Sequence, residues 1–264
     1  MKTLDSVFQS IDEGKSNLEF IKTGINSLDD LIDGGFLRKE LIVLGGHSGG
    51  GKSYLAGTIF WNAVKQGLKS SYFSLEISNE MVVSRLIGAI ANIKPIRVMT
   101  GILDYLEIET KAEAKAELSA YDQFMYFYDD VYQLDKIYKE IKDNQYEFVV
   151  IDFIQNVMAP GADEYSRLSS VALQLQKIAK ELNCCILILS QLSNQVAREK
   201  TDTVLEFKGS GSIATVCDIG LVITRGTEWS GGGNELFISL RKNRRGISGK
   251  SVSCGFKSPG GMIS

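Results

Sequence analysis

The feature that most constrains the fold is a glycine-rich run between an apolar segment and a helical one. Residues Gly46 to Ser53 read Gly-His-Ser-Gly-Gly-Gly-Lys-Ser and satisfy the pattern G-x-x-x-x-G-K-[ST]. Residues 40–44 predict a strand before the run, and residues 52–66, closed by Gly67, predict a helix after it. A chance glycine-rich turn would lack this setting. We therefore expect a loop whose backbone N–H groups, together with the helix N-terminus, bind phosphate.

Every residue of this loop is a candidate nucleotide ligand. Lys52 is expected to reach the β- and γ-phosphates of a nucleoside triphosphate, and the Ser53 hydroxyl is expected to ligate Mg²⁺. The candidate set is Gly46, His47, Ser48, Gly49, Gly50, Gly51, Lys52 and Ser53.

Apolar strands alternate with helices along the rest of the chain. Strands are expected at 71–75, 124–128, 148–151, 184–189, 219–224 and 235–240, and helices at 78–91, 103–120, 134–142 and 166–182. Residues 231–233, three glycines, predict a hairpin tip. The pattern predicts an α/β fold with a mostly parallel sheet flanked by helices. At 264 residues, one such domain with a short appendage is expected.

Polar side chains stand where three of these strands end. Asp152 follows the strand at 148–151, where a carboxylate can hold the Mg²⁺ shell. Glu76 follows another strand and can orient an attacking water, and Gln191 can contact the γ-phosphate. Taken singly, Glu76 and Gln191 are equally compatible with solvated surface side chains.

Two later segments carry candidate polar chemistry. In the basic run at 241–245, Lys242 and Arg244 are candidates for completing a neighbouring subunit's site, although a solvated turn or a DNA phosphate contact fits the residues as well. The loop at 206–213 combines Lys208 with small residues that can grip a nucleic-acid backbone. A plain loop is the alternative.

The first helix has one apolar stripe, formed by Leu4, Val7, Phe8 and Ile11. A segment this short cannot fold alone. It docks either on its own domain or, as an arm, on a neighbouring subunit.

Composition excludes several classes of protein. The net charge of −3 argues against a general polycation that coats nucleic acid. The four cysteines lack metal-site spacing and are expected to be buried thiols, and His47 is the only histidine. No transmembrane run or signal-peptide core is visible, so the cytoplasm is the expected location.

Six segments in order resemble the motor domain of the hexameric DnaB-type replicative helicases, a RecA-like group. The resemblance runs from Thr23 to about Gly249. The segments are Thr23-Gly24-Ile25 with Leu28-Asp29; Ser74-Leu75-Glu76-Ile77-Ser78; Val150-Ile151-Asp152-Phe153-Ile154-Gln155; Ala179-Lys180-Glu181-Leu182 followed by Leu189-Ser190-Gln191-Leu192; Phe207 to Ile213 with Asp218; and Lys242-Asn243-Arg244-Arg245-Gly246.

The resemblance implies an ATP- and Mg²⁺-dependent DNA helicase motor that works as a ring of six subunits. It assigns Glu76 as the catalytic glutamate and Lys242 and Arg244 as the trans lysine and arginine finger. Residues 1–20 would be a linker helix and hinge, and residues 21–264 the motor domain. A primase or a loader is an implied partner. Single-stranded DNA would be held by Lys208, Gly209, Ser210 and Gly211.

The chain also departs from the family pattern. Lys208 and Gly209 stand where the family has arginine and glutamate, and Ser193-Asn194 replaces Asn-Arg. The segment that would precede the linker helix is not in the sequence, as in a fragment or a short viral or plasmid form. Alternatives are a RecA/RadA- or KaiC-like ATPase without unwinding activity and a non-catalytic ATP-binding assembly or loader subunit. A small-molecule kinase fits less well because no arginine-rich lid insertion is seen.

Overall fold

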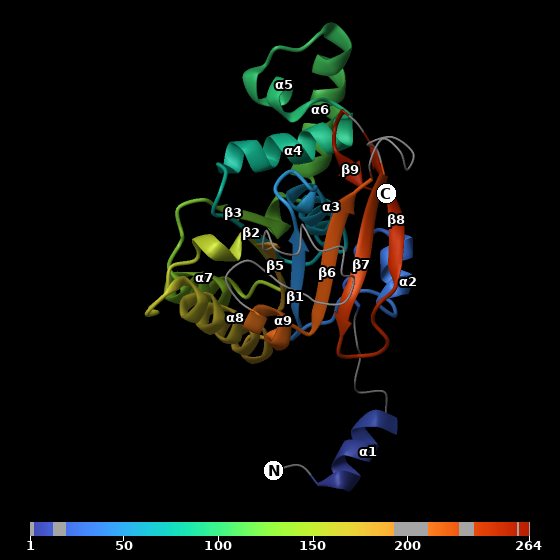
Figure 1. Cartoon of the computed structure of the whole chain (residues 1–264). Coiled ribbons are helices and arrows are strands. Elements are labelled where there is room, and N and C mark those ends of the chain that lie inside the picture. The colour runs from blue at the N-terminus through green and yellow to red at the C-terminus, as the bar shows by residue number, and fades with distance from the viewer. Residues whose placement is uncertain (1–2, 13–19, 193–210, 227–234, 258, 264) are drawn as a thin grey trace.

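The computed structural model describes residues 3–12, 20–192, 211–226, 235–257 and 259–263 (Figure 1). Within them a nine-stranded sheet has the order β3-β2-β4-β5-β1-β6-β7-β8-β9. The strands are β1 (Leu41–Gly46), β2 (Ser70–Ser74), β3 (Met125–Tyr128), β4 (Phe148–Asp152), β5 (Cys185–Gln191), β6 (Ile219–Arg225), β7 (Glu235–Asn243), β8 (Ser251–Lys257) and β9 (Met262–Ile263).

The first six strands in this order are parallel, and β7, β8 and β9 continue the sheet antiparallel. Since β1 lies between β5 and β6, the loop that follows β1 leaves the middle of the sheet. The α/β prediction is therefore confirmed, and the glycine-rich run stands where parallel α/β sheets place ligands.

Helices cover both faces of the sheet (Figure 1). They are α1 (Leu4–Asp12), α2 (Asn26–Leu31), α3 (Lys52–Lys65), α4 (Asn79–Ala91), α5 (Pro95–Thr100), α6 (Tyr105–Ser119), α7 (Leu134–Asn144), α8 (Glu164–Glu181) and α9 (Gly211–Val216). Successive side chains of a strand point to opposite faces of the sheet, so the side chains of β1 pack into two hydrophobic cores, one on each face. Ile42 and Leu44 pack with α3 and α4, whereas Leu41 and Val43 pack with α7 and α8.

Most predicted elements are confirmed within one or two residues. Four helices and strands lack a counterpart in the sequence reasoning: α5, which starts at Pro95, α9, and the strands β8 and β9. The four cysteines are buried and free, as expected. The glycine hairpin tip predicted at 231–233 lies outside the described residues.

Helix α1 presents its apolar stripe to solvent. Leu4, Val7 and Phe8 are 67%, 39% and 53% exposed. Figure 1 shows α1 apart from the sheet and its helices. Of the two predicted docking modes, packing on its own domain is therefore not observed. No helix among the described residues is long and apolar enough to cross a membrane.

Candidate nucleotide and magnesium site

The glycine-rich run forms a loop that wraps the start of α3. Gly49 and Gly51 have φ angles of 73° and 97°, a region that side chains rarely adopt, so the local turn requires glycine at both positions. Gly51 is the residue before the first helical turn of α3. The free N–H groups of this helix end therefore face the cavity above it, which binds anions well.

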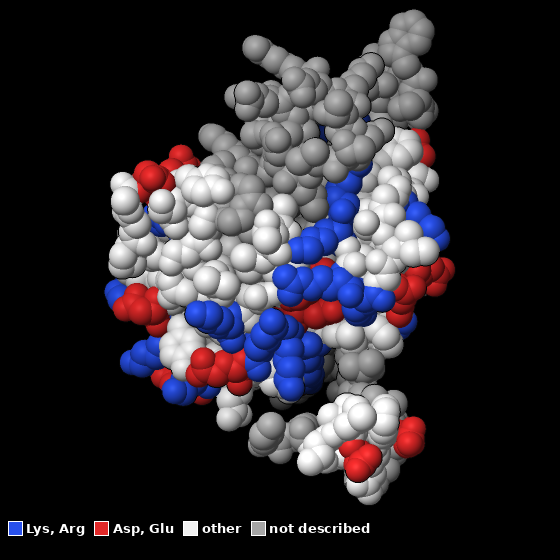
Figure 2. All heavy atoms as spheres, turned by 60° about the horizontal axis from the view of Figure 1, so that its bottom comes forward, with Lys and Arg blue, Asp and Glu red and all other residues white. Residues whose placement is uncertain are grey.

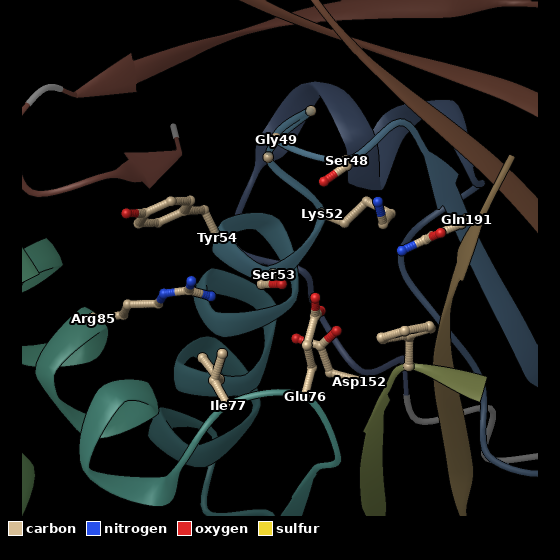
Figure 3. Close-up of a pocket in the computed structure, with 13 residues that line it drawn as sticks. Ser48, Gly49, Lys52, Ser53, Tyr54, Glu76, Ile77, Arg85, Asp152 and Gln191 are labelled. Carbon is tan, nitrogen blue, oxygen red and sulfur yellow. The ribbon is translucent and has the colours of Figure 1, made fainter. Parts of the chain in front are cut away.

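A cavity of about 230 Å³ opens over this loop and is shown in Figure 3. It gathers residues from the loop after β1, from α3 and α4, and from the ends of β2, β4 and β5. Its lining includes Ser48, Gly49, Gly50, Gly51, Lys52, Ser53, Tyr54, Glu76, Ile77, Arg85, Asp152, Phe153 and Gln191. The predicted site residues Lys52, Ser53, Glu76, Asp152 and Gln191 thus meet in one place.

Lys52 lies within the loop. Its Nζ donates hydrogen bonds to the carbonyl oxygens of Gly46 at 2.8 Å and His47 at 2.9 Å. Burial lowers the pKa of the Lys52 ammonium from its usual range, and the nearby Asp152 and Glu76 carboxylates oppose that shift. The ammonium is therefore set at the mouth of the loop, where a triphosphate would need a cation.

Asp152 is the buried carboxylate of the site, only 3% exposed at the end of β4. Burial raises its pKa, while hydrogen bonds from Ser53 and Tyr72 and the positive charges of Arg85 and Lys52 lower it. Desolvation dominates because the side chain is almost fully enclosed. A cation placed beside this carboxylate would relieve that cost.

The ends of β2 and β5, the strands on either side of β4, hold Glu76 and Gln191 at the cavity. Leu75 N donates to the carbonyl of Asp152 at 2.7 Å, and Asn156 Nδ2 donates to the Leu75 carbonyl at 2.8 Å. These bonds fix the turn that presents the exposed Glu76. Gln191 ends β5 opposite Gly46 in the parallel register. Its neighbour Ser190 accepts a hydrogen bond from Gln155 Nε2 at 3.0 Å.

The donor set fits Mg²⁺. A serine hydroxyl and a carboxylate, hydrogen-bonded to each other, are hard oxygen ligands of the kind that Mg²⁺ takes together with phosphate oxygens and water. No cluster of three or more His, Cys, Asp or Glu side chains suited to a metal occurs among the described residues. The site therefore suits a metal carried by a nucleotide, held by Ser53 and Asp152.

Sequence reasoning missed Arg85, a second cation of the cavity. This side chain projects from α4, and its guanidinium lies over the Tyr54 ring, 5.2 Å from the centroid. Figure 3 shows it directed toward Ser53, on the side away from Gln191. A single arginine in an amphipathic helix carries no pattern, so only the rotation of α4 in the fold reveals it.

Lys242 and Arg244 lie at the edge of the sheet where the parallel strands begin, and the loop lies at the opposite edge, where those strands end. Arg244 N donates to the Asp218 carbonyl at 3.0 Å, and Asp218 N donates to the carbonyl of Leu41, the first residue of β1. The glycine-rich loop follows the last residue of β1. The six residues of β1 make five steps of about 3.3 Å, so the two ends of the strand are about 17 Å apart. Within one chain these cations do not join the cavity.

At this edge the two cations contact the end of α9. Lys242 Nζ donates to the carbonyls of Ala214 and Thr215 at 2.7 and 2.6 Å. Arg244 pairs with Asp218 at 3.0 Å and is 45% exposed. The next residue, Arg245, is turned inward and pairs with Glu40 at 3.2 Å. Of the two adjacent arginines, Arg244 is the one available to an outside partner.

Figure 2 views the molecule with this edge brought forward and shows lysine and arginine side chains gathered across it. A chain of net charge −3 thus presents a basic face opposite its own phosphate loop. Of the expected DNA-binding residues, Lys208, Gly209 and Ser210 lie outside the described residues. Gly211 begins α9.

The strand order and the loop after the central strand define the class: a RecA-like P-loop nucleotide-binding fold. The DnaB-like helicase C terminal domain family matches residues 20–259, and the chain belongs to that family.

Relatives agree with this assignment. The chain is 28% identical over 243 residues to the replicative DNA helicase DnaB of Treponema pallidum (strain Nichols), covering 89% of this chain and 54% of that protein. It is 30% identical over 227 residues to a probable replicative DNA helicase of Trieres chinensis, covering 80% and 48%. The chain therefore spans about half the length of the curated relatives it matches.

Solved structures share the fold. A DnaB-like replicative helicase, described with its interactions with primase, superposes with a TM-score of 0.86 at 22% identity, covering 98% of this chain and 65% of that one. A separately solved ATPase domain gives 0.87 at 22% identity, covering 98% and 96%. A KaiC-like protein from Pyrococcus horikoshii OT3 gives 0.64 at 18% identity, covering 94% and 99%.

Proposed function

We propose that this chain is the ATP-hydrolysing motor of a replicative DNA helicase that works as a ring. The ring would have six subunits, as the resemblance to the hexameric DnaB-type helicases implies. The observation that carries the proposal is the division of charge within one subunit. The phosphate loop with Glu76 and Asp152 lies at one edge of the sheet, and Lys242 and Arg244 lie at the other. Heterologous, head-to-tail contacts generate a ring where the rotation between subunits closes, and each interface of that ring would contain one complete site.

In this proposal each residue of the cavity has one role. The loop N–H groups and Lys52 bind the phosphates, and Glu76 orients the attacking water. Bound Mg²⁺, held by Ser53 and Asp152, would neutralise charge on the phosphate oxygens. Gln191 would contact the γ-phosphate. Arg244 and Lys242 of the next subunit would stabilise the charge that develops in the transition state.

Assembly is proposed to use α1. Its apolar stripe is exposed, and burying it would stabilise a contact between subunits. Exposed apolar side chains on α5 and α6 and the turn between them offer a receiving surface on a second copy. They are Ile96, Met99, Ile102, Tyr105, Leu106 and Ile108. A longer protein containing this chain would, like the structure described with primase, be a candidate primase partner.

Single-stranded DNA is proposed to contact Lys208, Gly209, Ser210 and Gly211 in the ring channel. One cation per subunit, repeated around a ring, concentrates positive charge on one strand even though the chain is acidic. Hydrolysis at an interface would shift this loop along the strand.

The test measures ATP hydrolysis with and without single-stranded DNA, together with unwinding of a tailed duplex. We expect DNA-stimulated hydrolysis and unwinding, both lost in Glu76→Gln, which keeps the shape of the side chain and removes its charge. Stimulated hydrolysis without unwinding would favour the RecA/RadA- or KaiC-like alternative. No hydrolysis under any condition would refute the motor and leave a non-catalytic ATP-binding subunit, an outcome that the paired Glu76 and Asp152 argue against.

A further inference from the structure

A buried phenol hydroxyl contacts the carboxylate of Asp152. Tyr72 Oη donates to Asp152 Oδ2 at 2.9 Å, and the side chain of Tyr72 is 2% exposed. In the parallel register Tyr72 lies opposite Val150, so Asp152, two residues further along β4, is on the same face. The contact therefore follows from the pairing of β2 with β4.

The Tyr72 ring is held by the core. The Phe60 ring of α3 meets it edge-on, with centroids 5.6 Å apart at 84°. A ring packed on all sides has one orientation, so its hydroxyl has a fixed position. Asp152 is the partner that satisfies this buried donor.

We propose that Tyr72 is a positioning residue, which fixes the Asp152 carboxylate so that it can hold the Mg²⁺ of a bound nucleotide. The inference rests on the proposed function and adds a residue to that site. With Oδ2 held by Tyr72, the carboxylate cannot rotate freely, and it faces Ser53 in one orientation. Outer-shell partners of metal ligands commonly change metal affinity about 10- to 100-fold when removed.

The experiment compares the full chain with Tyr72→Phe, which keeps the ring and removes the hydroxyl. Binding of a fluorescent ADP analogue is titrated with Mg²⁺, and again in EDTA. We expect the Mg²⁺ concentration at half-maximal binding, the Mg²⁺ midpoint, to rise about 10-fold. The affinity for the nucleotide without metal should change less than about twofold. Electron paramagnetic resonance of Mn²⁺ in the nucleotide complex gives a second readout of metal affinity that does not depend on hydrolysis.

Tyr146→Phe is the matched control. Tyr146 is also 2% exposed, and its hydroxyl contacts Tyr128 at 2.6 Å, away from the cavity. Its removal should leave the Mg²⁺ midpoint unchanged, and thermal unfolding of both variants separates lost packing from lost positioning.

An unchanged midpoint and Mn²⁺ affinity in a folded Tyr72→Phe would overturn the proposal, as would an equal loss of metal-free binding. A wild-type chain that bound no nucleotide would overturn the proposed function as well. The two failures are therefore distinguishable.

Discussion

The proposed division of the site between subunits makes a quantitative prediction for mixed assemblies. Arg244→Ala should abolish hydrolysis at each interface to which the altered subunit contributes its basic edge, with a loss on the order of 10³-fold. Lys52→Ala should disable the other half of the site. The two residues lie beyond opposite ends of β1, a strand about 17 Å long, so they would serve different interfaces. Each variant alone then lacks one half of every site, but a mixture contains some intact interfaces.

The magnitude follows from counting interfaces. In an equal random mixture, an interface is intact when Lys52 comes from an Arg244→Ala subunit and Arg244 from a Lys52→Ala subunit. That holds for about one quarter of the interfaces in a head-to-tail ring. Mixtures should therefore recover up to about a quarter of wild-type hydrolysis, far above either variant.

The assay copurifies the two variants through different tags, confirms mixing by native mass spectrometry and measures ATP hydrolysis. Lys250→Ala, which removes an exposed cation just before β8, is the control and should remain active. Mixed assemblies no more active than the two separate variants would refute the shared site.

Three further predictions concern stability and assembly. Burial raises the pKa of Asp152, so the folded chain binds more protons than the unfolded chain between the ordinary and the raised value, and stability falls as pH rises through that window. At neutral pH the buried Asp152 carboxylate is ionised, and its desolvation lowers the stability of the folded chain. Asp152→Asn should therefore raise the Tm of the nucleotide-free chain by a few degrees and remove its stabilisation by Mg²⁺–nucleotide. A lower Tm would contradict this. Phe60→Ala should lower the free energy of unfolding by about 3–5 kcal/mol, measured by urea titration, because Phe60 is fully buried against two rings; a loss under about 1 kcal/mol would show that the core refills. Phe8→Asp should shift oligomers toward monomers in sedimentation velocity without changing the Tm of the monomer, whereas an unchanged distribution would exclude α1 from assembly.

Local signals account for what could be predicted from the sequence. The strand–loop–helix around Lys52 follows from apolar runs, glycines and a helix stop within a short window. Asp152, Glu76 and Gln191 could be grouped because parallel strands end at one edge of a sheet. These inferences need only the strands and their direction.

The contacts that sequence could not supply depend on register and rotation. Tyr72 reaches Asp152 only because β2 pairs with β4 in one register, and Arg85 enters the cavity only because α4 is turned toward it. The strand β8 was missed because its side chains are mostly exposed or half-exposed, with only Cys254 buried, which leaves no apolar run to recognise.

The tie between Asp218 and the start of β1 has a mechanical consequence for a ring. Asp218 Oδ2 accepts from Leu41 N at 2.9 Å while Oδ1 holds Arg244, so the strand that ends in the phosphate loop is joined at its start to the basic edge. In a ring, each subunit would therefore move as a rigid body that connects its two interfaces. Tilting a subunit to close one site would displace its contribution to the next. Recovery above that of the separate variants but below one quarter would measure how strongly neighbouring sites are linked in this way.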